Sequence, residues 1–247
     1  MGSKVVAIIP ARYESTRLPG KALAVIDGKP MVQHVYERTR AIAGVSRTLV
    51  ATDDERIADT VKKFGGEVAM TRRDHPSGTD RIAEVCRDLD ADIVVNVQGD
   101  LPFLEARMLE EAVRMVEADG DLPMATLKAP IRHQVELDNP NVVKVVTRSN
   151  GDALYFSRSP IPYWRAEHDD DGILGFRHIG LYVFRRQFLL EFARMPPTRL
   201  EQIEKLEQLR ALERGYRIGV TETVDEAGIE VDTPQDLERA RSYAANG

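Results

Sequence analysis

Near its amino terminus the chain reads Ile8-Ile9-Pro10-Ala11-Arg12-Tyr13-Glu14-Ser15-Thr16-Arg17-Leu18-Pro19-Gly20-Lys21. An apolar run over residues 5–9 predicts a buried strand, after which the composition changes to cations, hydroxyls and a Pro-Gly pair. In open α/β sheets, ligands bind outside the carboxyl ends of the strands. Three cations within ten residues, beside backbone amides freed by an irregular loop, suit a polyanion such as a triphosphate. We therefore expect a phosphate-binding loop, although charge alone leaves a solvated basic loop open.

The first half of the chain alternates between strand and helix patterns. Short apolar runs predict strands at 48–51, 68–70 and 93–97, and the last of these is apolar almost throughout, as a central parallel strand is. Three helices with apolar residues at helical spacing are expected between the strands of this half. The first begins after Pro30, the second is capped by Asp53 or Asp54, and the third begins after Ser77. Repeated βα units of this length predict an α/β fold with a doubly wound, mostly parallel nucleotide-binding sheet.

The second half departs from this alternation. Residues 142–147 and 153–157 predict two strands, and Asn150-Gly151 between them predicts a hairpin turn. A further strand is expected at 179–184. The spacing of five apolar residues predicts one large helix: Leu200, Ile203, Leu206, Leu209 and Leu212. We expect a core formed by 1–128 and 205–247 and an inserted, smaller antiparallel sheet region over 129–204.

Composition excludes several classes of protein. The chain has 247 residues, 43% of them hydrophobic, which is enough for a substantial core. A net charge of −6 argues against nucleic acid as a partner. The single cysteine, Cys86, lies in an apolar helical pattern and predicts a buried, inert thiol. No apolar run approaches the roughly 20 residues of a membrane span and no signal peptide is evident, so we expect a cytoplasmic protein with no membrane insertion.

Two aspartates suggest a metal site. Asp100 follows the apolar strand directly, and Asp232 precedes a Thr-Pro helix start. Each alone is more simply read as a turn or capping residue. Magnesium binds one or two carboxylates together with substrate phosphates, so the pair beside a phosphate loop indicates Mg²⁺.

The pattern Pro-Ala-Arg-Tyr-x-Ser-Thr-Arg-Leu-Pro-x-Lys at 10–21 resembles the signature of sugar-acid cytidylyltransferases, especially those for 3-deoxy-manno-octulosonate (Kdo). The resemblance continues through 70–81, 139–146, 153–158, 177–182 and 200–210. It implies a nucleotidyltransferase fold of the glycosyltransferase-A-like type, and a reaction that joins CTP to Kdo to give CMP-Kdo and pyrophosphate. It also implies Mg²⁺, a role in lipopolysaccharide biosynthesis, and a homodimer joined through the inserted region.

The resemblance also implies roles for individual residues. Arg12, Lys21 and Asp100 would be catalytic, and Asp100 and Asp232 would hold the metal. The residues expected to bind the nucleotide are Pro10, Ala11, Arg12, Arg17, Lys21, Thr52, Arg72, Ser77, Gly78, Arg81 and Gln98. Those expected to bind the acidic sugar are Gln98, Arg158, His178, Tyr182, Glu207 and Gln208.

Two departures from the family pattern keep alternatives open. Leu101 stands where the family has Glu, and Glu230 stands where it has Gly, each beside an expected metal ligand. The acceptor could therefore be another acid, such as an amino-Kdo, another ulosonic acid or a secondary-metabolite acid. A non-catalytic relative is the second alternative, against which the intact Arg12, Lys21 and both aspartates argue. Neither a P-loop nor a Gly-x-Gly-x-x-Gly motif occurs, which excludes the NTPase and dinucleotide readings. The preference for CTP over UTP, the number of Mg²⁺ ions and the presence of a general base stay open.

Overall fold

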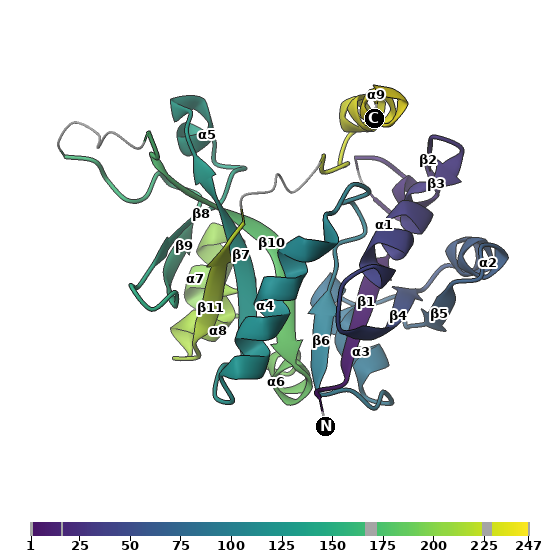
Figure 1. Ribbon diagram of the computed structural model, residues 1–247, viewed down its shortest axis with the longest axis horizontal. Helices are drawn as coiled ribbons and strands as arrows, with labels where there is room; N and C mark the ends of the chain where they lie inside the picture. The colour runs from purple at the N-terminus through teal and green to yellow at the C-terminus, as the bar shows by residue number, and fades with distance from the viewer. Residues whose placement is uncertain (1, 16, 166–171, 224–228, 247) are drawn as a thin grey trace. The chain divides into compact units, whose positions relative to one another are not determined.

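The chain folds into two compact units in a computed structural model that describes residues 2–15, 17–165, 172–223 and 229–246 (Figure 1). The first unit comprises 1–110 and 227–247, and the second comprises 111–226. Thr16 of the opening motif lies outside the described residues.

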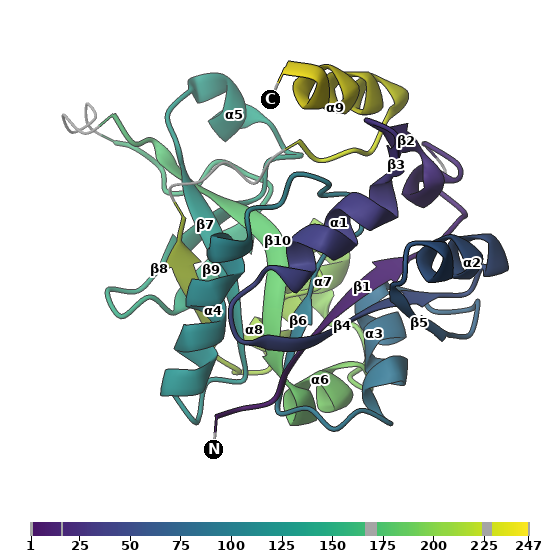
Figure 2. The same cartoon turned by 45° about the vertical axis from the view of Figure 1, so that its right-hand side comes forward.

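A parallel sheet forms the centre of the first unit. Its strands are β1 (Val5–Ala11), β4 (Val45–Thr52), β5 (Glu67–Met70) and β6 (Ile93–Asn96), in the order β6-β1-β4-β5. The first five residues of β1 are at most 3% exposed, because neighbouring strands and helices on both faces cover them. In Figure 2, α1 (Met31–Arg40) lies in front of these strands and α3 (Gly78–Cys86) behind them.

Local capping explains where the helices of this unit begin. Asp54 caps α2 (Glu55–Lys63) by accepting a hydrogen bond from the Arg56 backbone N–H at 3.0 Å, and Ser77 caps α3 through the Asp80 N–H at 3.2 Å. Both helix starts agree with the sequence prediction. The last helix, α9 (Pro234–Asn246), lies beside the small sheet of β2 (Val25–Ile26) and β3 (Lys29–Pro30), which follows the short helix η1 (Lys21–Leu23).

The second unit is built on a mixed sheet. Strand β7 (Met124–Ile131) pairs antiparallel with β10 (Gly175–Arg185) and parallel with β11 (Ile218–Glu222). The predicted hairpin is confirmed as β8 (Lys144–Thr147) and β9 (Ala153–Ser157), with Gly151 at a φ of +88°. The helices of this part of the chain are α4 (Ala106–Ala118), which begins in the first unit, α5 (Gln134–Asp138), α6 (Arg186–Phe192), α7 (Arg199–Glu204) and α8 (Leu209–Glu213).

The predicted large helix over 200–212 is wrong. The chain leaves the helical conformation at Lys205, which is left-handed with φ +54° and ψ +47°, and this break separates α7 from α8. Ile203 is 65% exposed, so the apolar spacing does not form one buried stripe. Instead Glu201 accepts hydrogen bonds from Arg210 at 2.9 and 2.5 Å, and this buried ion pair draws the two short helices together.

The predicted fold class is confirmed: the fold is α/β with a mainly parallel central sheet and a smaller antiparallel region. Cys86 is fully buried with no disulfide, as predicted. Among the described residues, no helix is both long and apolar enough to cross a membrane.

Candidate active site

A cavity of about 830 Å³ opens at the carboxyl ends of β1 and β6 in the first unit. Its wall brings together the end of β1, the loop that follows it, the start of α3, the turn after β6 and the segment before α9. Gly99 permits this closeness, because a Cβ there would lie 2.9 Å from the Pro10 carbonyl oxygen. The lining residues that the sequence predicted are Pro10, Ala11, Arg12, Arg17, Lys21, Ser77, Gly78, Arg81, Gln98, Asp100 and Asp232.

Lys21 lies between the two predicted metal ligands. Its Nζ donates to Asp100 Oδ2 at 3.0 Å and to Asp232 Oδ1 at 2.8 Å, and Arg17 Nη2 donates to Asp232 Oδ2 at 2.7 Å. Burial opposes the charge on Lys21, but the two carboxylates outweigh it and raise the pKa of the ammonium above its usual value. Arg12 lines the same cavity, is exposed, and has no carboxylate partner among the described residues.

Asp232 is not the cap of α9, which was its simplest interpretation from sequence. Thr233 Oγ1 accepts the Asp236 N–H at 3.2 Å, so the neighbouring threonine caps the helix. The Asp232 carboxylate is thereby free for Lys21 and Arg17. A hydrogen bond of 2.9 Å from the Val231 N–H to the Asp100 carbonyl fixes the two acidic segments side by side.

Glu230 joins the same cluster. Carboxylate oxygens of Asp100, Glu230 and Asp232 lie within 4.8 Å of one another. Desolvation, followed by repulsion from Asp100 and Asp232, raises the pKa of Glu230 to about 7. Closely spaced carboxylate oxygens are the donors that a hard divalent cation prefers, so this set fits Mg²⁺. The sequence placed Glu230 only beside the metal ligands, not among them. Leu101, the other departure, is buried and does not line the cavity.

Two predicted nucleotide-binding residues lie away from the cavity wall. Thr52 is fully buried at the end of β4, where its hydroxyl accepts the Asp54 N–H at 3.2 Å. Arg72 is exposed and faces Asp74 and Glu84 at 3.8 and 3.6 Å. Arg81 does line the cavity, but its Nη1 is already engaged by Asp53 at 3.1 Å and by Thr71 at 2.5 Å.

Several lining residues were not predicted as site residues: Tyr13, Glu14, Ser15, Pro19, Ala22, Arg56, His75, Pro76 and Gly99. Most of them lie within or next to motifs that the sequence already singles out. Arg56 is different, because it stands on the first turn of α2 with no motif around it.

The predicted sugar-binding residues, apart from Gln98, belong to the second unit. His178 and Tyr182 are neighbours on β10, with ring centroids 5.5 Å apart, and the His178 Nε2 lies 2.9 Å from Thr126 Oγ1. Burial lowers the pKa of His178 to about 3. Burial, together with the charge of Glu207, raises the pKa of Tyr182. Glu207 and Gln208 lie in the turn between α7 and α8 rather than on a helix.

Gln208 and Arg158 differ in the N–H groups that they leave available to a ligand. Gln208 is 4% exposed, and its Nε2 has no hydrogen-bond partner among the described residues. Arg158 donates through Nε to the Glu204 carbonyl at 2.7 Å, through Nη1 to Pro140 at 2.9 Å and through Nη2 to Lys205 at 3.4 Å. A guanidinium has five N–H groups, so these contacts do not exhaust it.

Comparison with known proteins identifies the family of the chain. A family model described as cytidylyltransferase matches residues 6–218. The 3-deoxy-manno-octulosonate cytidylyltransferase of Geobacter metallireducens is 57% identical over 96% of both chains, and that of Trichlorobacter lovleyi is 54% identical over 99% of this chain and 100% of the other. A solved structure of CMP:2-keto-3-deoxy-manno-octonic acid synthetase complexed with CTP has a TM-score of 0.93 and 47% identity, and covers 99% of both chains. The chain belongs to the 3-deoxy-manno-octulosonate cytidylyltransferase family.

Proposed function

We propose that this protein is a nucleotidyltransferase that joins CTP and Kdo to give CMP-Kdo and pyrophosphate. The observation that carries the proposal is the cluster at the cavity floor, where Lys21 and Arg17 meet Asp100 and Asp232. Cations for a triphosphate and carboxylates for a divalent cation converge there, which is the pair of requirements for phosphoryl transfer. The names of the close relatives and the CTP complex of the similar structure agree with it.

In the proposed reaction, the C2 hydroxyl of Kdo attacks the α-phosphorus of CTP in line. A new phosphorus–oxygen bond forms as the hydroxyl loses its proton to solvent, the bond from the α-phosphorus to the bridging oxygen breaks, and pyrophosphate leaves with its electron pair. Arg12 and Lys21 hold the phosphates and offset the charge that builds on the departing group, and Arg17 assists them. Asp100 and Asp232 would hold Mg²⁺, which supplies Lewis-acid polarisation of the phosphate and acidifies the attacking hydroxyl.

The second unit supplies the groups for the sugar. The Gln208 Nε2, which has no hydrogen-bond partner among the described residues, supports a role in binding a hydroxyl, because a buried N–H without an acceptor is costly. Glu207, His178 and Tyr182 complete the polar set, and a low pKa keeps His178 neutral near pH 7. Arg158 is the candidate for the sugar carboxylate through its remaining N–H groups. Gln98, which lines the cavity, contacts both substrates in this proposal.

We place the reaction in the cytoplasm, where it would supply activated Kdo for lipopolysaccharide, and we propose that the protein acts as a homodimer. These points rest on family membership. One observation supports an alternative acceptor: the carboxylate of Glu230 lies within the proposed metal site.

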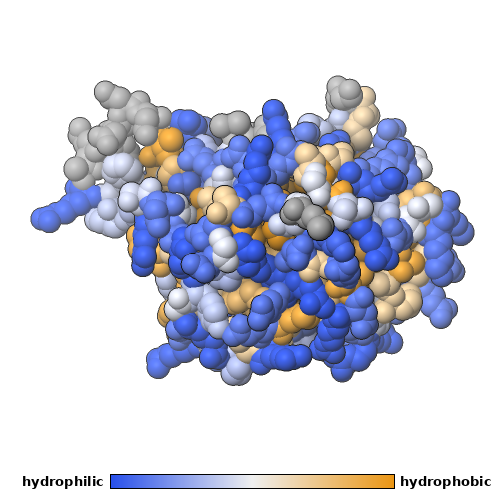
Figure 3. Space-filling view, turned by 60° about the horizontal axis from the view of Figure 1, so that its bottom comes forward, coloured by the Kyte–Doolittle hydropathy of each residue, from blue (hydrophilic) through white to orange (hydrophobic). Residues whose placement is uncertain are grey.

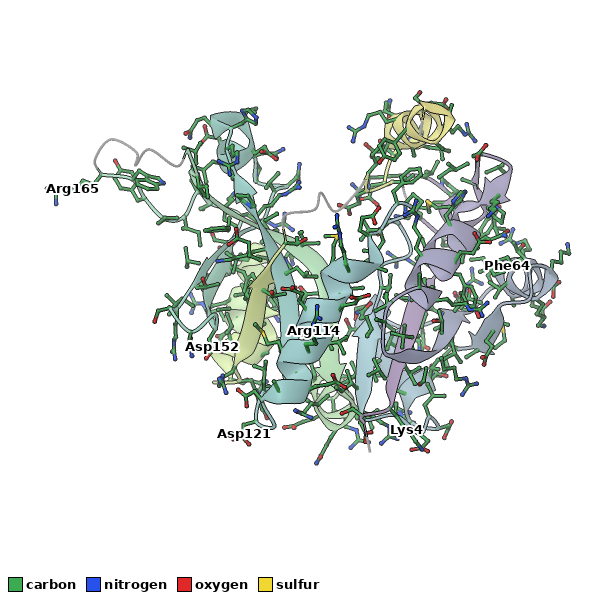
Figure 4. The ribbon with its side chains drawn as sticks, viewed as in Figure 1. Lys4, Phe64, Arg114, Asp121, Asp152 and Arg165 are labelled. Carbon is green, nitrogen blue, oxygen red and sulfur yellow. The ribbon has the colours of Figure 1, made fainter. Side chains whose placement is uncertain are left out.

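The substitution Asp100→Asn tests the proposed chemistry. It removes a negative charge from the proposed metal site while keeping the shape of the side chain, so turnover should fall by at least about 100-fold. Pyrophosphate release at saturating CTP and Kdo measures turnover, and a thermal melt checks the fold. Asp90→Asn is the matched control, because Asp90 does not line the cavity and pairs with Lys4, which lies just before the amino end of β1 (Figure 4 labels Lys4). Near-normal turnover of Asp100→Asn would contradict the metal assignment.

A further inference from the structure

The loop that carries the cations is held weakly by its own backbone. Within it, the Gly20 N–H donates to the Tyr13 carbonyl at 2.9 Å and the Lys21 N–H to the Leu18 carbonyl at 3.2 Å. Arg17 and Lys21 near its end pair with Asp232 and Asp100, but Arg12 at its start has no carboxylate partner among the described residues. Side-chain anchors must therefore hold it in place.

The two halves of this loop have different anchors. Leu18 packs against an apolar cluster that also includes Met31, Val231 and Leu237, which ties the second half to the body of the unit. In the first half Arg12 and Glu14 are exposed, Glu14 forms a surface ion pair with Arg73, and Tyr13 is the large side chain that is half-buried.

Tyr13 is in contact with Arg56 on α2. The Arg56 guanidinium carbon lies 3.3 Å from the centroid of the Tyr13 ring, a close cation–π contact. Asp54, the cap of α2, orients the same guanidinium by accepting from Nε at 2.9 Å and from Nη2 at 2.6 Å. The ring also fills the space beside Gly20, where a Cβ would lie 3.1 Å from the ring carbon Cε2. Arg56 and Tyr13 thus link the loop to the start of a helix.

We propose that Arg56 is a positioning residue for the triphosphate: by stacking on Tyr13, it holds the loop so that Arg12, Arg17 and Lys21 face the cavity. This inference rests on the proposed function, because it assumes that CTP is the ligand. The Asp54–Arg56–Tyr13 contact holds the loop before the nucleotide arrives, so it lowers the cost of ordering the loop on binding. Its loss should weaken CTP binding and leave the chemical step unchanged.

A double-mutant cycle in CTP affinity tests the proposal. Dissociation constants for CTP with Mg²⁺ are measured by calorimetry on wild type, Arg56→Ala, Tyr13→Leu and the double variant. Each single variant should raise the dissociation constant about fivefold, as expected for loss of one cation–π contact. The double variant should bind no more weakly than either single one, because both remove the same contact. In turnover, the KM for CTP should rise while kcat stays within about twofold.

Controls separate this role from the other possible roles. Arg40→Ala removes a second Arg–Tyr pair, with Tyr36 on α1 at 5.9 Å and away from the cavity, and should leave CTP affinity unchanged. If Arg56→Ala does not fold, Arg56→Gln takes its place in the cycle. Additive losses in the cycle would show that Arg56 contacts phosphate directly, and unchanged CTP affinity would show that it only stabilises the fold. Either result overturns the inference, whereas failure of wild type to bind CTP would overturn the proposed function.

Discussion

At the scale of single residues, charge balance decides how the cavity floor is organised. Lys21 and Arg17 together offset the charges of Asp100 and Asp232, so that both carboxylates are paired in the free protein. Glu230 is the third carboxylate of this cluster, and no ion pair joins it to another described residue. Desolvation first, and then repulsion from Asp100 and Asp232, raises the pKa of Glu230.

Glu230 should make the stability of the metal-free protein depend on pH. The pKa of Glu230 is about 7 in the folded chain and 4.5 for a carboxyl in the unfolded chain. Between pH 4.5 and pH 7 the folded state therefore holds a proton that the unfolded state has lost. Stability therefore falls as pH rises through this window, and it is unaffected below pH 4.5. Glu230→Gln should match wild type near pH 4.5 and be more stable at pH 8, by a modest amount because Glu230 is exposed.

Urea unfolding at pH 4.5 and pH 8, without divalent cations, measures this difference. A gap between Glu230→Gln and wild type that stays constant with pH would contradict the assignment of the raised pKa to Glu230.

At the scale of elements, local signals predicted most of the first unit. Asp54 and Ser77 mark their helices by capping, and Asn150-Gly151 marks the hairpin of the second unit, because each acts through neighbours in sequence. The break at Lys205 could not be predicted, because helical apolar spacing continues through it and the cause is a tertiary ion pair between Glu201 and Arg210. The contact of Arg56 with Tyr13 could not be predicted either, because it joins residues that are far apart in the sequence.

Lys205 should be a site where glycine stabilises the protein. The left-handed conformation costs a non-glycine residue about 1 kcal/mol, and glycine adopts it without this penalty. Lys205→Gly should raise the free energy of unfolding by about 0.5 kcal/mol after the entropy of the unfolded glycine is counted. Lys62→Gly is the control, because Lys62 lies within α2 and glycine there should destabilise.

Urea titrations of both variants test this account of the break between α7 and α8. A loss of stability in Lys205→Gly would mean that contacts of the lysine side chain, rather than the backbone, hold the turn.

At the scale of the whole molecule, exposed apolar side chains bear on assembly. Among the described residues, four of the seven large exposed apolar side chains lie within 129–204, the region expected to join the subunits: Val135, Leu154, Tyr163 and Ile203; Val25, Met70 and Tyr243 lie in the first unit. On the face drawn in Figure 3, hydrophilic side chains predominate, with hydrophobic ones visible between them. Exposed apolar groups gathered in one part of a chain are typical of a subunit contact.

A dimer should therefore be seen by light scattering, with a mass of about twice the 27.7 kDa of the chain. Replacing Leu154 and Tyr163 together by Asp should shift the mass toward that of one chain, because buried charge opposes association. A monomeric mass for wild type at micromolar concentration would contradict the proposed homodimer.

The most direct test of the central claim is pyrophosphate release from CTP and Mg²⁺, run in parallel with Kdo and with no acceptor. The account predicts rapid release only when Kdo is present, in equal amount to the CMP-Kdo formed. Tight binding of CTP without release in the presence of Kdo would contradict it, and would direct attention to another acid as the acceptor.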